Sequence, residues 1–342
     1  MKNKSILFLL ITVLLCGCGK QIHSPQKNFF ALRHDPLSSE LVALVVPRYE
    51  IESVVLFGVT SYDLNQNGQS LIYSAPLSDY EQLFIIPKGE AIQQFTDVKK
   101  FLRYPQISPD GGKIVLETRD DFFGKSQIMI MDSLSKKMDA LLTDNTSDIY
   151  PRWSPDGNFI SFLSQQASCP DNYTGSCFDL SIVSAKSKQI IKTFSGPIED
   201  YFPVSWSPDS NEIIFFRWEN GFYHLINYDL DKNVEIEVQN SGTDDEMGVW
   251  SSKSNQLAFA RAFEDSQTIS EICILENQIA TCIDQKGSEI TDIFWIDDQT
   301  ILYGLYDKTG DATTVKVLDT TTQKNMALGV YSGYLDSFET LK

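Results

Sequence analysis

Short runs of alternating apolar and polar residues follow one another along most of the chain, separated by turns rich in Pro, Asp, Asn and Gly. The stretch YPRWSPDGNFISF, residues 150–162, is typical: an apolar approach ends in a Ser-Pro-Asp-Gly turn, and an alternating run follows. Alternation with a period of two is the signal of a strand with one buried face. Because no segment after residue 20 shows a persuasive 3.6-residue apolar stripe, the pattern predicts an all-β protein.

The same unit recurs along the chain at a nearly constant spacing. Its anchors, aligned on the residue before each turn, are Leu64, Ile107, Trp153, Trp206, Trp250 and Trp295, with intervals of 43, 46, 53, 44 and 45 residues. Each unit holds four short strands, and a four-stranded unit repeated every 40–50 residues is typical of a propeller blade. The spacing therefore predicts a six-bladed β-propeller of four-stranded antiparallel blades, with seven blades as the alternative.

The turn residues and the tryptophans have structural explanations. Pro pre-sets φ in the turn, Asp bonds its own backbone, and Gly takes a positive φ. A large apolar residue just before the turn can fill the wedge between two blades, which stacking must bury. We interpret the repeated tryptophans as core residues rather than as ligand platforms.

The N-terminus reads as an export signal. Residues 1–20, MKNKSILFLLITVLLCGCGK, have a basic start and an apolar run that is too short to span a bilayer. The stretch LCGC resembles a bacterial lipobox, which implies a signal peptide over residues 1–17 and a lipid on Cys18, palmitate included; the alternative is an ordinary secretory signal with chance cysteines. Residues 18–38 are predicted to be a tether and residues 39–342 a single propeller domain, in which Ser39–Thr60 closes the ring or begins a seventh blade.

Four further cysteines predict two local disulfides. Cys169 and Cys177 flank a Pro/Asn/Gly loop that a disulfide could close. Cys273 and Cys282 fall directly opposite each other if residues 277–278 form a two-residue hairpin loop, and facing positions lie within disulfide reach. Zinc is the competing interpretation, but the chain has no CxxC and only three histidines.

Composition excludes some partners and most catalytic chemistry. The formal net charge of -18 argues against nucleic acid, which needs a basic surface. No His lies beside a nucleophile in the pattern of a triad, so no catalytic residue is predicted. Asp63, Asn65 and Asn67 have the spacing that begins a calcium loop, but Ser74 stands where a bidentate Glu is needed, so a turn is favoured and no cofactor is expected beyond a structural calcium ion.

The repeat resembles that of the β-propeller of TolB, the periplasmic partner of peptidoglycan-associated lipoprotein, and of its wider family. PRWSPDG followed by FDLSIVS matches the signature, and the resemblance covers roughly residues 60–331, weakening where Lys253 and Ser254 replace Asp-Gly and where IDDQ replaces the motif. TolB carries an additional N-terminal α/β domain, for which about forty residues here are too few. In that family the residues ahead of the Pro-x-Trp position lie near one mouth of the central channel, which implies a binding face here made of Arg103, Tyr104, Asp148, Tyr150, Asp200, Tyr201, Asp245, Glu246, Glu289 and Asp292.

Together these features predict a non-catalytic lipoprotein of the bacterial cell envelope, with a monomeric propeller that binds a protein, peptide or glycan on one face. A ring of acids and tyrosines suits a basic ligand or a cation. The alternative is a carboxylate-dependent enzyme acting on envelope or extracellular polysaccharide. Gly19 after the lipid site favours the outer membrane if the cell has one, and otherwise the outer leaflet of the cytoplasmic membrane.

Overall fold

The computed structural model of the chain describes most of the propeller. The described residues are 27–35, 38–46, 50–64, 70–87, 90–143, 146–169, 176–198, 204–238, 244–251, 256–262, 269–276, 279–284, 289–332 and 334–340. The signal peptide, Cys18 and the first part of the tether lie outside them. No helix in these ranges is long and apolar enough to cross a membrane.

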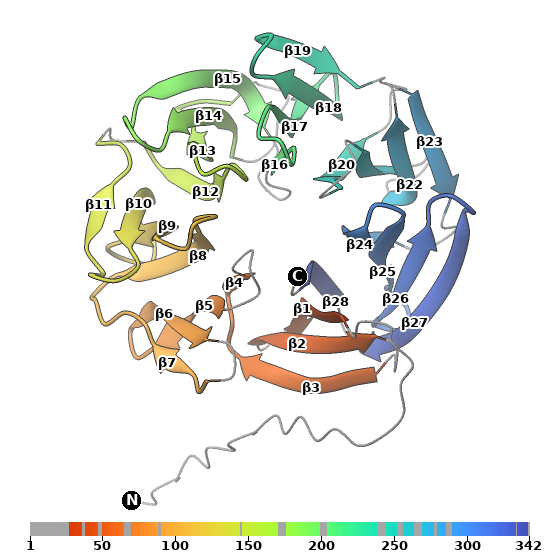
Figure 1. The fold of residues 1–342 in the computed structure, drawn as a ribbon, viewed down its shortest axis with the longest axis horizontal. Coiled ribbons are helices and arrows are strands. Elements are labelled where there is room, and N and C mark those ends of the chain that lie inside the picture. Colours follow the sequence, from red (N-terminus) through yellow and green to blue (C-terminus); the bar gives the residue numbers. More distant parts are fainter. Residues whose placement is uncertain are drawn as a thin grey trace, which may run out of the picture.

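The described strands form seven four-stranded antiparallel blades, which are arranged in a ring around a central axis (Figure 1). One backbone pairing, between Ile198 and Arg217, joins blades 4 and 5 into a single eight-stranded sheet. Blade 1 holds β1 (Lys27–Asp35), β2 (Ser38–Val46), β3 (Glu50–Phe57) and β28 (Tyr334–Thr340), and blade 2 holds β4 (Ser61–Leu64), β5 (Ser70–Leu77), β6 (Tyr80–Pro87) and β7 (Gln93–Gln94). Blade 3 holds β8 (Phe101–Ile107), β9 (Lys113–Arg119), β10 (Gln127–Asp132) and β11 (Met138–Ala140), and blade 4 holds β12 (Asp148–Trp153), β13 (Phe159–Gln165), β14 (Phe178–Ser184) and β15 (Ile190–Ile198).

The remaining three blades follow the same order. Blade 5 holds β16 (Ser205–Trp206), β17 (Glu212–Glu219), β18 (Phe222–Asp229) and β19 (Val234–Glu237); blade 6 holds β20 (Asp245–Trp250), β21 (Leu257–Ala262), β22 (Ile269–Glu276) and β23 (Ile279–Asp284); blade 7 holds β24 (Glu289–Asp297), β25 (Thr300–Asp307), β26 (Ala312–Asp319) and β27 (Lys324–Ser332). The all-β propeller of four-stranded blades is thus confirmed.

The repeat analysis identified blades 2–7 and so predicted six blades, but the ring holds seven, the alternative considered above, because blade 1 is built from both ends of the chain. Its inner strand is β28, which pairs with β1, so the C-terminal strand closes the ring. Lys27–Asp35, assigned above to the tether, is strand β1 of this blade, and Ser39–Thr60 supplies its two outer strands instead of a closing strand. Blade 1 escaped the repeat count because its inner strand and its second strand come from opposite ends of the chain, so no turn joins them.

Strand direction gives the ring two distinct faces. Each complete blade has four antiparallel strands, so every inner strand begins on the same side of the ring. We call this side the mouth face; it also carries the connections between second and third strands. The opposite side, where each inner strand turns into the second strand, is the turn face. Lys27 pairs with Val46 at the end of β2, which places the start of β1 on the turn face.

The Ser-Pro-Asp-Gly turns close through their own side chains. Ser154 donates its hydroxyl to Asp156 at 2.6 Å and accepts the amide of Phe159 at 2.9 Å. Ser108 makes the same pair of bonds in blade 3, and Ser207 does so in blade 5, where Ser210 stands in place of the Gly with φ of 64°. Gly157 has φ of 73°, the left-handed conformation that the turn needs. The motif is therefore a turn-forming unit, as the sequence predicted.

The tryptophans lie between blades. Trp153 donates its indole N–H to the Gln106 carbonyl of the preceding blade at 3.2 Å, and Trp295 does the same to Val249 at 3.0 Å. Trp206 is 8% exposed and donates to the hydroxyl of Ser161 in the preceding blade at 3.0 Å. The interpretation of these three residues as core is confirmed, and each of the three also joins two neighbouring blades through a hydrogen bond.

Both predicted disulfides are present. Cys169 bonds Cys177, with Cα atoms 5.6 Å apart, and Cys273 bonds Cys282 across β22 and β23, where the two residues are direct register partners. Cys273 is fully buried within the apolar cluster between blades 5 and 6. The second disulfide therefore fastens the outer edge strand of blade 6 to its core.

Candidate functional site

Three inner strands share one irregularity near the mouth face. The register shifts between Arg103 and Gln106 in β8, between Ile149 and Arg152 in β12, and between Glu246 and Val249 in β20. Inside each bulge one residue has a positive φ: 47° at Tyr104, 52° at Tyr150 and 58° at Met247. Left-handed backbone at bulky residues is uncommon and costs on the order of 1–3 kcal/mol. Such strain persists where the surrounding structure holds it, often at a binding site.

Two of these residues meet across blades 3 and 4. The rings of Tyr104 and Tyr150 are 4.5 Å apart at 71°, and their hydroxyl oxygens are 3.5 Å apart. The Tyr104 amide donates to the Ser61 hydroxyl of blade 2 at 2.8 Å. Burial raises the pKa of the Tyr104 phenol, which therefore stays neutral. The tyrosine pair thus joins three blades and leaves both rings partly accessible at the mouth.

Arg103 also connects blade 3 to blade 2. Its Nη2 lies 2.6 Å from Oε1 of Glu81, which is 6% exposed on β6 of blade 2. Its guanidinium also lies 5.5 Å from the centre of the Phe122 ring. The Arg103 side chain therefore already has an ion-pair partner and an aromatic partner within the protein.

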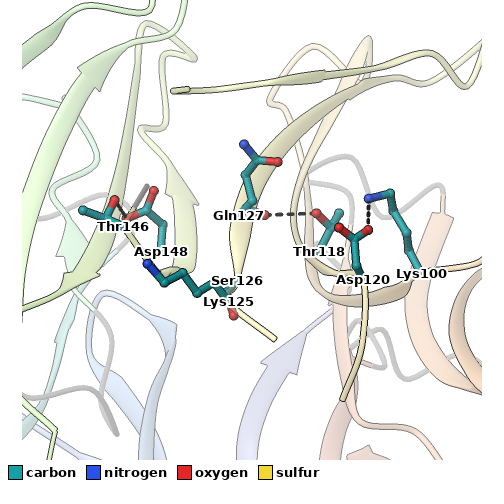
Figure 2. A pocket seen from close by; sticks show the side chains of 8 residues that line it. All are labelled: Lys100, Thr118, Asp120, Lys125, Ser126, Gln127, Thr146 and Asp148. Carbon is teal, nitrogen blue, oxygen red and sulfur yellow. Dashed lines mark hydrogen bonds and ion pairs between the residues drawn. The ribbon is translucent and has the colours of Figure 1, made fainter. Parts of the chain in front are cut away.

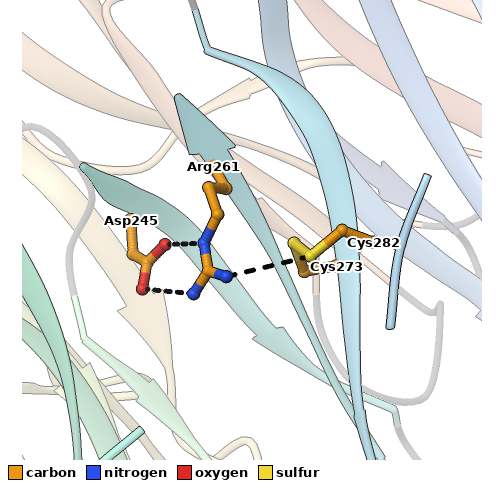
Figure 3. Close-up of a disulfide and its surroundings, with 4 residues drawn as sticks. All are labelled: Asp245, Arg261, Cys273 and Cys282. Carbon is orange, nitrogen blue, oxygen red and sulfur yellow. Dashed lines mark hydrogen bonds and ion pairs between the residues drawn. A yellow bond between two sulfur atoms is a disulfide. The ribbon is translucent and has the colours of Figure 1, made fainter. Parts of the chain in front are cut away.

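The predicted acids mostly have hydrogen-bond or ion-pair partners within the protein. Asp148 is 4% exposed and accepts the hydroxyls of Thr146 at 2.9 Å and Ser164 at 2.7 Å. Asp245 is 2% exposed and forms a bidentate ion pair with Arg261 (Figure 3). Nε of Arg261 lies 2.6 Å from Oδ1, and Nη2 lies 3.0 Å from Oδ2. Burial raises the pKa of Asp245, although Arg261 acts in the opposite direction.

The remaining predicted residues behave similarly or fall outside the described chain. Glu289 pairs with Lys308 at 2.7 Å, and Asp292 accepts the amide of Ile293 at 2.8 Å. Glu246 is half-buried beside the bulge of β20. Asp200 and Tyr201 lie outside the described residues. The structure therefore places the described members near the mouth but does not present them as a ring of exposed charge.

Asp63 has a role that the sequence did not indicate. It lies on the inner strand β4, and its Oδ2 accepts the Ile107 amide of blade 3 at 2.8 Å. Burial raises its pKa to about 7, while that hydrogen bond and the charge of Arg152 on β12 act to lower it. Asp63 is thus an inter-blade acceptor in the channel wall; Asn65 and Asn67, the other members of the weak calcium pattern, lie outside the described residues.

One other group has the composition of a metal site. Ligand atoms of Glu271, Cys273 and Cys282 lie within 4.8 Å of one another. Both sulfurs are joined in the disulfide, so they cannot act as thiolate ligands in this state. Nη1 of Arg261 also lies 3.9 Å from the Cys282 sulfur (Figure 3), and a cation beside the group disfavours a metal ion further.

Outward from the tyrosine pair, the mouth face carries aromatic side chains and a cavity that the sequence analysis did not single out. Phe122 and Phe123, in the loop between β9 and β10, are 56% and 93% exposed. The cavity measures about 170 Å³ and lies between blades 3 and 4. Figure 2 shows Lys100 and Asp120 on one side of it, Thr146 and Asp148 on the other, and Ser126 and Gln127 between. In the sequence, DDFFGK at residues 120–125 could have indicated this surface, since paired phenylalanines are unusual in a charged loop.

The fold has many counterparts among solved structures. The chain is similar to TolB from Acinetobacter baumannii, with a TM-score of 0.54, 14% identity, and coverage of 89% of this chain and 79% of that one. It is also similar to the propeller domain of the Trilobed protease from Pyrococcus furiosus, with a TM-score of 0.60, 11% identity, and coverage of 90% and 93%. Dipeptidyl peptidase 4 from Porphyromonas gingivalis gives a TM-score of 0.57, 13% identity, and coverage of 89% and 55%. At these identities the likeness shows a shared fold and no shared activity.

Comparison at the level of sequence is more specific. No curated protein matches the chain significantly. The family model described as the TolB beta propeller domain matches residues 60–297, which is more than half of the chain. That range contains blades 2–6 and the inner strand of blade 7, with every Ser-Pro-Asp-Gly turn and every inter-blade tryptophan described above. The chain therefore belongs to the TolB β-propeller family.

Proposed function

We propose that this protein is a lipid-anchored, non-catalytic binding module of the bacterial cell envelope, whose propeller holds a protein, peptide or glycan on its mouth face. The observation that carries the proposal is the tyrosine pair. Tyr104 and Tyr150 keep a strained backbone at the mouth, and their rings remain partly accessible. Tyrosine supplies a large contact area and a hydroxyl at little entropic cost, which suits recognition.

The burial of the acids at the mouth face narrows the class of ligand that we expect. Because Asp148 and Asp245 are buried and already hydrogen-bonded, they offer little attraction to a basic partner. Shape and aromatic contact at the tyrosine pair, rather than a negative funnel, would then determine affinity. This favours a ligand with apolar and hydrogen-bonding groups over a free cation.

The position of the N-terminus supports the anchored arrangement. Strand β1 begins at Lys27 on the turn face, nine residues after Cys18. That length of chain spans at most roughly 30 Å. A lipid on Cys18 would hold the turn face towards the membrane and direct the mouth face away from it, where a partner has access. Substitution Cys18→Ser should abolish labelling by a palmitate analogue and release the protein from the membrane fraction.

Crosslinking in cells tests the binding face directly. A photoreactive amino acid placed at Tyr150 should capture a partner in intact cells, because this side chain lies at the proposed contact. The matched position is Leu134, 91% exposed on the turn face of blade 3. Equal capture from both positions, or capture from Leu134 alone, would contradict the proposal.

A polysaccharide-cleaving enzyme is the second candidate, and Asp63 is the observation that favours it. Burial raises the pKa of this inner-strand carboxyl to about 7, so it retains a proton near neutral pH, as a general acid must. The solved structures similar to this chain include both TolB and a dipeptidyl peptidase, so the fold does not decide between the two. Release of reducing ends from envelope polysaccharide that is lost in Asp63→Asn would establish the enzyme and overturn the scaffold.

A further inference from the structure

The cavity between blades 3 and 4 combines polar groups of several kinds. Two lysines and two aspartates line it, Lys100, Asp120, Lys125 and Asp148, so its formal charge is zero in a chain of net charge -18. Lys100 and Asp120 form an ion pair with each other, and Asp148 accepts two hydroxyls. A charged ligand would gain little here, whereas an uncharged ligand with many donors and acceptors would find partners.

The neutral part of the lining has the same character. Thr118, Ser126 and Thr146 contribute hydroxyls and Gln127 contributes an amide (Figure 2). The hydroxyl protons are used within the protein: Ser126 donates to Glu117, Thr146 donates to Asp148, and Thr118 donates to the Gln127 carbonyl. The hydroxyl oxygens therefore offer lone pairs, and the two lysines offer donors, to a ligand that carries several hydroxyl groups, because each ligand hydroxyl both donates and accepts.

A buried acceptor lies directly behind this lining. Ser126 donates its hydroxyl to Oε1 of Glu117 at 2.8 Å. Glu117 is 1% exposed, and its Oε2 has no hydrogen-bond partner among the described residues. A buried carboxylate oxygen without a donor is costly. Ser126 is itself 1% exposed, and Arg119 pairs with Oε1 of Glu117 at 2.7 Å, so this buried carboxylate holds the Ser126 wall of the cavity in place rather than meeting a ligand.

The loop that forms one wall of the cavity also displays an apolar surface. Phe122 and Phe123 stand between Asp120 and Lys125, both of which line the cavity. Their rings are 5.2 Å apart at 80°, and Phe101 meets Phe122 at 5.8 Å. The Phe123 side chain, 93% exposed, leaves an aromatic face in water beside a polar cavity. A ligand that covers this face needs an apolar side as well as hydroxyl groups.

A saccharide ring meets both requirements, with hydroxyls at its edge and C–H groups on its face. The cavity, about 170 Å³, is smaller than the roughly 300–1,000 Å³ of sites that enclose drug-sized ligands, so it fits one ring of a longer chain. We propose that this cavity and the Phe122–Phe123 loop form a subsite for one ring of an uncharged saccharide chain. The inference rests on the proposed function, because it names the ligand class for one part of the mouth face.

Saturation-transfer NMR and calorimetry on the purified full-length chain test the subsite. The probes are cellotetraose, maltotetraose and the tetramer of N-acetylglucosamine, with trigalacturonate as the charged comparison. At least one uncharged tetramer should bind, and Phe123→Ala should weaken it about fivefold or more, since an aromatic contact contributes on the order of 1 kcal/mol. Leu134→Ala, which removes an equally exposed side chain from the turn face of the same blade, should leave binding unchanged.

Several outcomes would overturn the subsite. They are no binding of any uncharged tetramer at about 10 mM, binding of trigalacturonate alone, or equal binding by Phe123→Ala and the wild type. Because Phe123 makes few contacts, its loss should not disturb folding, and an unchanged melting temperature verifies this. Capture from Tyr150 together with no tetramer binding would refute the saccharide subsite and leave the proposed function intact. Tetramer binding without capture would instead refute a partner at the tyrosine pair.

Discussion

Tyr104 of β8 and Tyr150 of β12 meet edge to face across a blade boundary, with ring centres 4.5 Å apart, and each projects from a left-handed backbone position. The two residues occupy the same place in consecutive repeat units, just ahead of the Pro. The contact therefore follows from the repeat itself: equal bulges in neighbouring blades bring equal side chains together at the mouth.

The first prediction concerns the energy of this pair. A double-mutant cycle of Tyr104→Leu and Tyr150→Leu should give a coupling of about 0.5–1.5 kcal/mol in the free energy of unfolding, the usual range for an aromatic pair. Tyr150→Phe is the control, because the hydroxyl oxygens are 3.5 Å apart and contribute little. Urea unfolding of the four proteins measures the coupling, and additive effects would show that the rings do not stabilise each other.

The repeat allowed the blades to be predicted because each carries its own local signals. Ser154, Asp156 and Gly157 form their turn with bonds to neighbours at most five residues away. The register of Cys273 opposite Cys282 is equally local, since a short hairpin sets it. Blade 1 could not be counted this way because β1 and β28 lie at opposite ends of the chain and share no motif.

The candidate site was predictable only in its location. The sequence placed Asp148, Asp245 and the tyrosines near one mouth, and the described residues lie there. Whether an acid is exposed or paired depends on side chains from other strands, such as Ser164 for Asp148 and Arg261 for Asp245. Those partners lie 16 residues away, opposite the acids on the next strand of the same blade, and the bulge in each inner strand shifts the register so that the turn alone does not set which residue faces the acid.

The second prediction separates two tryptophans at equivalent positions. Trp206→Phe removes the bond to Ser161, whose hydroxyl is fully buried, and should cost about 1–3 kcal/mol in the free energy of unfolding. Trp250 is the matched residue, because its indole N–H is buried without a partner in the described chain. Trp250→Phe should therefore cost clearly less. Chemical unfolding compares the two variants, and equal losses would mean that ring volume alone matters.

The third prediction concerns the ion pair of Asp245 with Arg261. Arg261→Met leaves a buried carboxylate without its counter-charge, which should cost about 3–5 kcal/mol at pH 7. The loss should shrink as the pH falls towards 4, where Asp245 can take a proton and become neutral. The double variant Asp245→Asn/Arg261→Met should recover part of the stability.

A more exposed arginine provides the comparison for this pair. Arg217 binds Glu219 at 2.6 Å and Glu235 at 2.9 Å, but both carboxylates are accessible to water. Arg217→Met should therefore cost less than about 1 kcal/mol. A loss for Arg217→Met as large as that for Arg261→Met, measured by the same unfolding experiment, would contradict the role assigned to burial.

The fourth prediction is a pH dependence that originates at Asp63. Burial raises its pKa in the folded protein from 3.8 to about 7, so between these values the folded state holds a proton that the unfolded chain has lost. The stability contributed by this group is fully present below pH 4 and is lost as the pH rises through 7. Asp63→Asn does not titrate, and its amide oxygen can still accept the Ile107 amide.

The melting temperature of Asp63→Asn relative to the wild type should therefore rise between pH 4.5 and pH 8. Asp110→Asn is the control: the Ser108 hydroxyl lowers the pKa of Asp110, so this carboxyl is already charged throughout that range and the difference between variant and wild type should stay flat. A flat difference for Asp63→Asn as well would show that Asp63 is ionised in the folded channel. Its bond to Ile107 would then be made by a carboxylate, and the case for Asp63 as a proton donor to a polysaccharide would be lost with it.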